Sequence, residues 1–457
     1  MRINENSSRE MYKQVGMVAG PIALQSLIGS SLNLVDNLMI GGLGETALNS
    51  VGVAVQVFFV YWMLVYGFCG GAATFISQFF GVRDMVNVRR TAGFTVAVCM
   101  GFAILFFLGS VIFPEKIIRV FTSYPQVIEL GAEYLRTGAP CFLMVAVTQP
   151  LTVSLRATQQ TTQPLMASVA ALCVNTVLNY ALIYGKLGLP ELGVQGAALA
   201  TVCSRTIELT LILLFVFARK NPVKGPVRDF ASCSRELAGR IVRNAVPTTI
   251  NETMWGLGTS MYVAAYARIS VTAGAAFQAC NTINNLFSMA AFSIGDAVLI
   301  LVGQKLGEGK KDEAYDMTKK LLKLALVVGA VMGVFTFLFG KPILSLFEFT
   351  PEGASMAWKV LMVYAATLWL EVYGGTLVTG VLRCGGDTKF AMFTEVGTVW
   401  CIGVPVAFTT ALLLHWPVYL AVLGVKLEAL VKSIILTFRF FSRKWLKNVI
   451  GGLSDKS

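Results

Sequence analysis

The sequence predicts an all-α polytopic membrane protein with twelve transmembrane helices in two parallel six-helix lobes. The 457-residue chain is 55% hydrophobic and only 14% charged, whereas a soluble globular protein carries about 25% charged residues. So few charges could not cover the surface of a soluble fold, and much of the apolar surface must therefore face lipid. Motifs of the first half also return in the second half at a nearly constant spacing, which indicates an internal repeat.

The expected helices are the apolar runs that are long enough to cross a bilayer, which takes about 20 residues. Backbone polar groups in lipid need partners within the chain, so these runs predict helices rather than strands. In chain order, the expected spans cover residues 14–40, 49–78, 91–113, 126–153, 163–187, 192–218, 237–267, 273–303, 316–345, 353–381, 388–413 and 416–438.

Basic residues set the expected orientation of these helices. The loops and termini on one side of the membrane hold 26 Lys and Arg residues, and those on the other side hold seven. Since cytoplasmic loops carry the excess of Lys and Arg, we expect a multi-pass protein of the cell membrane with both termini in the cytoplasm. This topology also accounts for the net charge of +12. We therefore expect membrane lipids, and no nucleic acid, as partners. We also expect the protein to be a monomer.

The longest polar connector lies in the middle of the chain, at residues 219–240. Residues 219–236 of this connector, RKNPVKGPVRDFASCSRE, have the Pro, Gly and charge content of a cytoplasmic linker. We therefore expect one six-helix lobe at residues 1–218 and a second at residues 241–457.

The two halves share motifs at equivalent places. The shift is 226 residues from Pro21 to Pro247 and from the Gln78–Gly81 loop to the Gln304–Gly307 loop, and 227 from Arg156 to Arg383. A repeat of six helices keeps its orientation in the second copy, so a pseudo-twofold axis along the membrane normal should relate the two lobes. Such an architecture favours a two-lobed transporter with a cleft between its lobes.

Residue usage argues against an enzyme. The chain has a single histidine, His415, and it contains no HExxH, GxSxG or Walker motif. Nine cysteines include no CxxC pair, and most of them lie in apolar runs, where cysteine acts as a small packing residue. We therefore expect no cofactor, no disulfide framework and no nucleotide-driven pump.

Several longer motifs resemble a known family. The segments PIALQSLIGSSLNLVDNLMIGGLG, ISQFFG, LVGQKLG, LRATQQTTQP and NTVLNYALIYGKLGLPELGVQGAALAT are similar, in order, to those of the multidrug and toxic compound extrusion (MATE) family. The likeness spans roughly residues 10–450. It implies a V-shaped pair of six-helix lobes and export driven by sodium or protons. The wider superfamily also includes flippases for lipid-linked sugars.

Asp36 is the strongest candidate for a functional carboxylate, because a charge deep in a membrane helix is costly. A buried carboxylate can exchange protons, or hold Na⁺ if oxygen ligands surround it. Asn175 and Asn179 share one face of the fifth helix, and Thr201 adds a hydroxyl from the sixth. The family resemblance implies a coupling-ion site at Asp36, Asn175 and Asn179, with Thr201 as a further member. Alternatively, the asparagines only join helices through interhelical hydrogen bonds.

The second lobe offers candidates for contact with a cationic substrate. Glu252, Glu371 and Asp296 are acids within spans, and Trp255 and Tyr373 could add cation–π contacts. MATE proteins that have an acid in the seventh helix place it a turn deeper than Glu252, so that family site does not transfer directly. The alternative is that these acids form lobe-stabilising pairs with neighbouring polar groups.

Other residues receive structural roles. Pro21 and Pro247 are expected hinges, and ion binding at Asp36 would bend or shift the first helix at Pro21. Arg205 with Glu208 and Glu428 with Lys432 have the spacing of ion pairs within a helix, whereas Glu395 has no evident local partner. Arg156 and Arg383 are interpreted as cytoplasmic latches or lipid-headgroup contacts.

Together these features predict a secondary active efflux transporter that works by alternating access. It would export amphipathic, often cationic, organic compounds in exchange for Na⁺ or H⁺. The alternative on the same fold is a flippase for a lipid-linked or other amphiphilic precursor. Few basic residues lie within the spans to bind its phosphate, namely Arg205, Lys323, Lys426 and Lys432.

Overall fold

The computed structural model describes residues 5–218, 221–345 and 349–453, so residues 219 and 220 of the expected linker lie outside the described part. Across these three ranges the chain is helical and contains no strand. It divides into two compact units. The amino-terminal unit comprises Leu24–Ala72 and Asp84–Ile241, and the carboxy-terminal unit comprises Ala73–Arg83, Val242–Ser457 and the chain up to Ala23.

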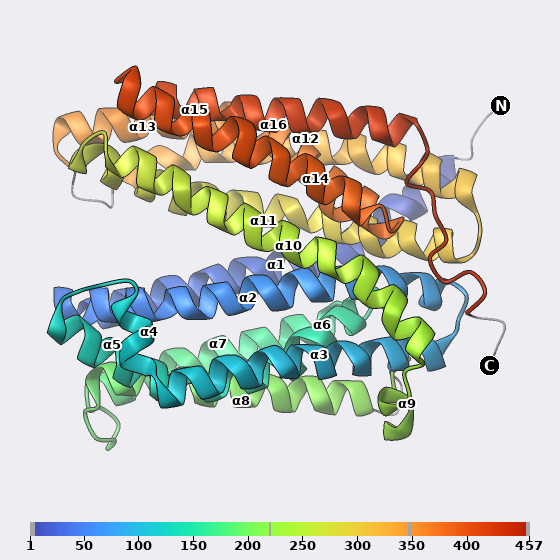
Figure 1. Ribbon diagram of the computed structural model, residues 1–457, viewed down its shortest axis with the longest axis horizontal. Coiled ribbons are helices and arrows are strands. Elements are labelled where there is room, and N and C mark those ends of the chain that lie inside the picture. The colour runs from blue at the N-terminus through green and yellow to red at the C-terminus, as the bar shows by residue number, and fades with distance from the viewer. Residues whose placement is uncertain (1–4, 219–220, 346–348, 454–457) are drawn as a thin grey trace. The chain divides into compact units, whose positions relative to one another are not determined.

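The helices follow the expected spans (Figure 1). The first half contains α1 (Glu5–Gly41), α2 (Glu45–Gly81), α3 (Met85–Ile112), α4 (Pro114–Arg119), α5 (Pro125–Gly138), α6 (Pro140–Ala157), α7 (Thr162–Ile183) and α8 (Gly193–Phe217). The short α9 (Val227–Ala231) precedes α10 (Arg235–Ala267), α11 (Val271–Gly307), α12 (Lys311–Leu344) and α13 (Pro351–Gly375). They are followed by α14 (Thr388–Thr398), α15 (Val404–Phe408) and α16 (Val418–Phe441).

These helices make the chain a multi-pass membrane protein. Within the described ranges, eight helices are long and apolar enough to cross a bilayer, or nine if the bent pair α5–α6 counts as one span. The helices α1, α10 and α16 coincide with expected spans but do not reach this threshold. Each of them carries charged residues within its length, such as Glu252 in α10 and Lys432 in α16.

Three expected spans are not simple α-helices. The span expected at 126–153 bends by 48° between α5 and α6, at Pro140, which cannot donate a backbone hydrogen bond. In the span expected at 388–413, π-helical turns at Val399–Gly403 and Thr409–Leu413 flank α15. A third π-helical segment, Thr376–Leu382, continues α13. Such turns are frequent at functional sites.

The amino-terminal unit is built on packed helix pairs. The helices α7 and α8 lie side by side, and α3 and α8 both pack against α6 (Figure 1). The Tyr61 hydroxyl donates a hydrogen bond to the carbonyl of Phe142 at 2.7 Å. An apolar cluster around Leu155 and Ile212 lies between α6 and α8.

The carboxy-terminal unit contains a close crossing of two helix ends from different halves of the sequence. A Cβ added to Gly81 would overlap the carbonyl oxygen of Gln304, and one added to Gly307 would overlap that of Gln78. Both glycines therefore permit an approach that any side chain would prevent. The Gln78 side chain also donates to the carbonyl of Cys384 at 2.9 Å and accepts from the amide of Val449 at 2.9 Å.

Candidate ion-coupling site

Asp36 on α1 meets two asparagines of α7 inside the amino-terminal unit. Asn179 Nδ2 donates hydrogen bonds to Asp36 Oδ1 at 2.5 Å and to Asn175 Oδ1 at 3.0 Å. Asn175 and Asn179 lie one helical turn apart, which puts both amides on the face of α7 that meets Asp36. Asp36 is half-buried, and both asparagines are fully buried.

The two asparagines have unused hydrogen-bonding capacity. Asn179 Oδ1 and Asn175 Nδ2 are buried and have no hydrogen-bond partner among the described residues. Buried polar atoms are normally paired, so unpaired ones beside a carboxylate call for an explanation. A carboxylate with neighbouring amide oxygens is a ligand set for a small hard cation. The same carboxylate can take up a proton.

The hydroxyl of Thr201 on α8 donates to the carbonyl of Ala197 at 3.0 Å within its own helix, and it lies near Tyr134 of α5. Tyr134 and Arg205 both lie within electrostatic reach of Asp36. Thr201 is therefore near the cluster through Tyr134. Tyr134 was not among the expected site residues, because an aromatic residue in an apolar run is an ordinary packing residue.

Arg205 is bound to an acid of its own helix. Its Nη1 lies 2.6 Å from Glu208 Oε2, which confirms the expected i,i+3 pair. Ser168 donates to the other Glu208 oxygen at 3.1 Å, and Gln25 donates to Ser168 at 2.9 Å. Arg156 then donates to Gln25 Oε1 at 2.7 Å. This polar network of the amino-terminal unit runs from α6 through α1 and α7 to α8.

The acids of the carboxy-terminal unit are paired inside the protein. Arg383 Nη2 lies 2.6 Å from Glu252 Oε1, and the side chains are 4% and 10% exposed. The interpretation of Arg383 as a lipid-headgroup contact is therefore wrong, because burial and this ion pair keep the guanidinium away from lipid. For Glu252, this geometry corresponds to the lobe-stabilising alternative.

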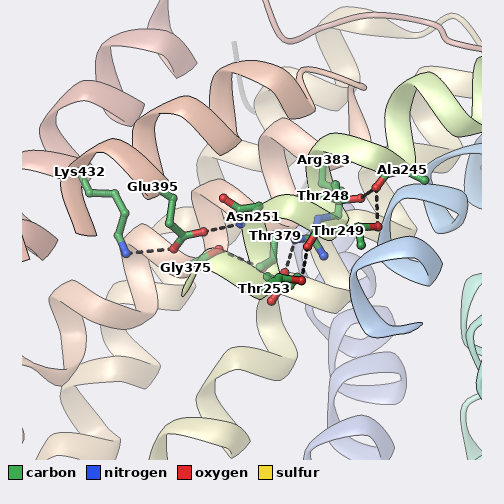
Figure 2. A network of polar contacts seen from close by, with 11 residues as sticks. Ala245, Thr248, Thr249, Asn251, Thr253, Gly375, Thr379, Arg383, Glu395 and Lys432 are labelled. Carbon is green, nitrogen blue, oxygen red and sulfur yellow. Dashed lines mark hydrogen bonds and ion pairs between the residues drawn. The ribbon is translucent and has the colours of Figure 1, made fainter. Parts of the chain in front are cut away.

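A second network in this unit gathers around Glu395 of α14 (Figure 2). Asn251 Nδ2 donates to Glu395 Oε2 at 2.6 Å, and Lys432 Nζ donates to Glu395 Oε1 at 3.1 Å. Lys432 Nζ also lies 3.2 Å from Glu428 Oε1, which confirms the expected i,i+4 pair. Tyr262 donates to Glu428 Oε2 at 3.2 Å. The partners of Glu395 come from α10 and α16, which explains why no local sequence signal revealed them.

The remaining substrate candidates make separate contacts in this unit. Glu371 forms an ion pair with Lys426 of α16, and the Tyr373 hydroxyl lies 2.9 Å from that of Thr437. The Trp255 side chain is exposed. Asp296 on α11 is half-buried, and it lies close enough to Glu252 for the two carboxyl groups to interact electrostatically.

The two expected hinge residues lie inside continuous helices. Pro21 is within α1 and Pro247 within α10. A proline in a helix interior removes one backbone hydrogen bond and favours bending at that point. Their role as hinges stays a prediction.

Known proteins resemble the chain over nearly its whole length. It is 25% identical over 454 residues to the "Probable multidrug resistance protein YoeA" of Bacillus subtilis (strain 168), covering 98% of this chain and 96% of that protein. It is 27% identical over 454 residues to the "Probable multidrug resistance protein NorM" of Thermotoga maritima, covering 96% and 94% of the two chains.

The fold also matches a solved structure. The "Crystal structure of MATE in the straight conformation" superposes with a TM-score of 0.86 and 20% sequence identity, covering 95% of this chain and 97% of that one. This match confirms the expected helical membrane fold. The MatE family model matches residues 21–181 and 245–409. The chain belongs to the MatE family, and it is a transporter rather than an enzyme.

Proposed function

We propose that the protein is a secondary active exporter of amphipathic, often cationic, organic compounds, driven by exchange for Na⁺ or H⁺. The curated relatives reported above carry the words "multidrug resistance" in their names and match the chain almost end to end. Those names support the multidrug substrate class for this chain.

The observation that carries the ion coupling is the unbalanced charge of Asp36. Arg205 is held by Glu208, and Asp36 forms no salt bridge with any residue that the structure describes. A lone carboxylate in a low-dielectric interior is costly, and a bound cation or proton removes this cost.

Either coupling ion fits the groups around Asp36. A proton would bind the carboxylate directly, and the neutral carboxyl would keep its contact with Asn179. Sodium would use the Asp36 carboxylate with amide oxygens of Asn175 and Asn179, one of which already lacks a partner. We propose that ion binding here alternates with substrate binding, with Pro21 as the point at which α1 bends.

The same proposal includes the sequence-based organisation of the chain. Residues 1–218 and 241–457 would form the two repeats, joined by a cytoplasmic linker at 219–240, with both termini in the cytoplasm. The distribution of basic residues supports this orientation. Glu371, Tyr373, Asp296, Glu252 and Trp255 remain the candidates for substrate contact, with Glu252 and Glu371 bound to Arg383 and Lys426 in this structure.

The flippase alternative loses support from the ion pairs. A lipid-linked phosphate needs free cationic side chains in its path. Three of the four basic residues within the expected spans, Arg205, Lys426 and Lys432, are each bound to an acid of the protein, and the fourth, Lys323, is exposed on α12. The charges of the first three are therefore engaged by carboxylates.

Transport by full-length protein in liposomes tests the proposal. Uptake of a cationic dye should be measured with a sodium gradient and a proton gradient imposed separately. We expect one gradient to drive transport by the wild type, and Asp36→Asn to reduce that uptake to the level of protein-free vesicles. Glu129→Gln, which removes an exposed carboxylate of α5, should transport like the wild type. Undiminished gradient-driven uptake by Asp36→Asn would contradict the assignment.

A further inference from the structure

The polar networks of the two repeats follow equivalent paths. Gln25 donates to Ser168 at 2.9 Å in the first repeat, and Asn251 donates to Glu395 at 2.6 Å in the second. The first residues of these pairs are 226 positions apart and the second ones are 227 apart, the same shifts that relate the repeated motifs. Asn251 and Glu395 therefore occupy the places of Gln25 and Ser168.

The ends of the two networks are similar but do not match residue for residue. Arg156 donates to Gln25 itself at 2.7 Å on α1, whereas its counterpart Arg383 donates at 2.6 Å to Glu252, the residue after Asn251 on α10. At the other end, Ser168 donates a hydrogen bond to Glu208, which forms an ion pair with Arg205. In the second repeat, Glu395 forms an ion pair with Lys432, which also pairs with Glu428.

The charges along these two paths differ. In the first repeat, Glu208 and Arg205 cancel each other, and Ser168 is neutral. In the second repeat, Glu395 and Glu428 share the single ammonium of Lys432. Leaving aside the ends at Arg156 and at Arg383–Glu252, the second network therefore has one negative charge more than its counterpart.

This excess charge is buried. Glu395 and Glu428 are each 7% exposed, and Lys432 is 8% exposed. Two carboxylates that share one site cannot both remain ionised at low cost, because like charges at short range disfavour the second ionisation. An imbalance of one charge calls for one bound cation.

Two buried atoms of this cluster lack hydrogen bonds. Asn251 Oδ1 has no partner among the described residues, although its residue is only 3% exposed. Glu428 Oε1 lies 3.2 Å from Lys432 Nζ, but it accepts no hydrogen bond there. If the Asn251 amide turned by half a rotation, Oδ1 would face Glu395 as an acceptor.

We propose that Glu395, Lys432 and Glu428 form a proton-binding site of the second repeat, at which Glu395 takes up one proton and Asn251 turns to accept a hydrogen bond from the protonated carboxyl. This inference extends the proposed ion-coupled export by adding a second titrating position. It does not depend on the Asp36 assignment for its own test.

The donors around the cluster select a proton over Na⁺. Sodium needs several oxygen ligands. Asn251 and Lys432 occupy both oxygens of Glu395, and Tyr262 occupies one oxygen of Glu428. The Lys432 ammonium also pairs with both carboxylates, and it therefore occupies the position that a metal cation would need.

The second repeat has no copy of the Asp36 cluster at the equivalent place. A shift of 226 residues takes Asp36 to Tyr262, and a shift of 227 takes Asn175 and Asn179 to Ile402 and Val406. Tyr262 instead holds Glu428. The second repeat therefore carries its acids, Glu395 and Glu428, on α14 and α16 instead.

Other charged groups near Glu395 are accounted for within the same unit. From α10, Glu252 lies within its electrostatic reach and is paired with Arg383, and Asp296 of α11 lies near that pair. From α16, Lys432 and Glu428 face it directly. The Glu252–Arg383 pair is neutral, and Asp296 adds negative charge, so neither supplies the cation that the cluster lacks.

Infrared difference spectroscopy on full-length protein in lipid nanodiscs tests this site, because a protonated carboxyl has its own carbonyl band. The Asp36→Asn protein serves as the background and removes the first titrating group. Between alkaline and acidic pH we expect a carbonyl band that Asp36→Asn/Glu395→Gln loses. Asp36→Asn/Lys432→Met should show a larger band, because two carboxylates then remain without an ammonium.

Controls separate this inference from the proposed function. Ser168→Ala changes the equivalent position of the first repeat, which cannot titrate, and should leave the band unchanged. Replacing choline chloride by sodium chloride at constant ionic strength should also leave it unchanged. A band that persists in Glu395→Gln, or that sodium abolishes, overturns the proposal. If Glu395→Gln does not fold, an unchanged band in Lys432→Met overturns it. The proposed function is tested separately, by the loss of gradient-driven dye uptake in Asp36→Asn.

Discussion

Arg383 and Glu252 form a buried ion pair across 131 positions of the sequence, with Arg383 Nη2 2.6 Å from Glu252 Oε1. The same arginine accepts a hydrogen bond at its backbone carbonyl from Thr74 at 2.8 Å. It thereby joins the end of α2, the middle of α10 and the end of the π-helical segment Thr376–Leu382. One residue at the end of a span holds three elements of the carboxy-terminal unit together.

Breaking this pair should destabilise the protein strongly. We expect Arg383→Met to reduce the free energy of unfolding by about 3–5 kcal/mol, because Glu252 would remain as an unpaired buried charge. The double variant Glu252→Gln/Arg383→Met should regain much of that loss. Thermal unfolding in detergent would measure both. Equal destabilisation of the single and double variants would show that the charge pair is not the cause.

The crossing of α2 and α11 should not tolerate a methyl group. We expect Gly81→Ala and Gly307→Ala each to lower the unfolding free energy by about 1–3 kcal/mol, since the added Cβ overlaps a backbone carbonyl. Gly101→Ala is the matched control, because no atom lies within 4 Å of its added Cβ. That control should be neutral or slightly stabilising. Equal unfolding temperatures for all three variants would show that the two helices do not pack closely enough for an added methyl group to overlap the backbone.

Asp387 should make stability depend on pH. Burial alone would raise the pKa of Asp387, but hydrogen bonds from Arg439 at 2.7 Å and Lys447 at 2.9 Å, together with their charges, hold the pKa below its usual range. The resulting stability is present above the unfolded pKa and is lost as pH falls through the folded pKa.

We therefore expect Asp387→Asn to unfold at a lower temperature than the wild type at neutral pH. The difference should shrink below about pH 4, the ordinary range of an aspartate. Melting temperatures recorded from neutral to acidic pH would test this. A difference that is constant with pH would exclude the charge of Asp387 as its source.

The segment after α16 should contribute to stability through one tryptophan. Trp445 is fully buried, and its indole nitrogen donates to the carbonyl of Phe440 at 3.1 Å. We expect Trp445→Ala to cost about 3–5 kcal/mol of unfolding free energy. Lys444→Ala, at an exposed neighbouring position, should have little effect. Similar melting temperatures for both variants would contradict docking of this segment.

Local patterns were sufficient to predict much of this protein. Apolar runs predicted where helices lie, because each helix buries or exposes its own consecutive residues. The pairs Arg205–Glu208 and Glu428–Lys432 were also predictable, since residues three or four apart lie on one helical face. The neighbourhood of Asn175 and Asn179 follows from the same geometry.

Long-range pairing could not be predicted in this way. The partners of Glu395 come from α10 and α16, and Glu371 pairs with Lys426 across 55 positions. Hydropathy indicates that these charges are buried, but it carries no information about which helices face each other. The bend at Pro140 had a visible cause, yet the apolar run continues through it, so the sequence predicted one straight span.

The crossing of Gly81 and Gly307 has a consequence for how the chain can move. Each glycine contacts the backbone of the other repeat's glutamine, so the contact is isologous, like that of a symmetric dimer. A rotation about the axis that relates the repeats exchanges the two halves of this contact. Any motion that preserves the axis changes the two halves of the crossing alike, so we expect the two glycine contacts to loosen together.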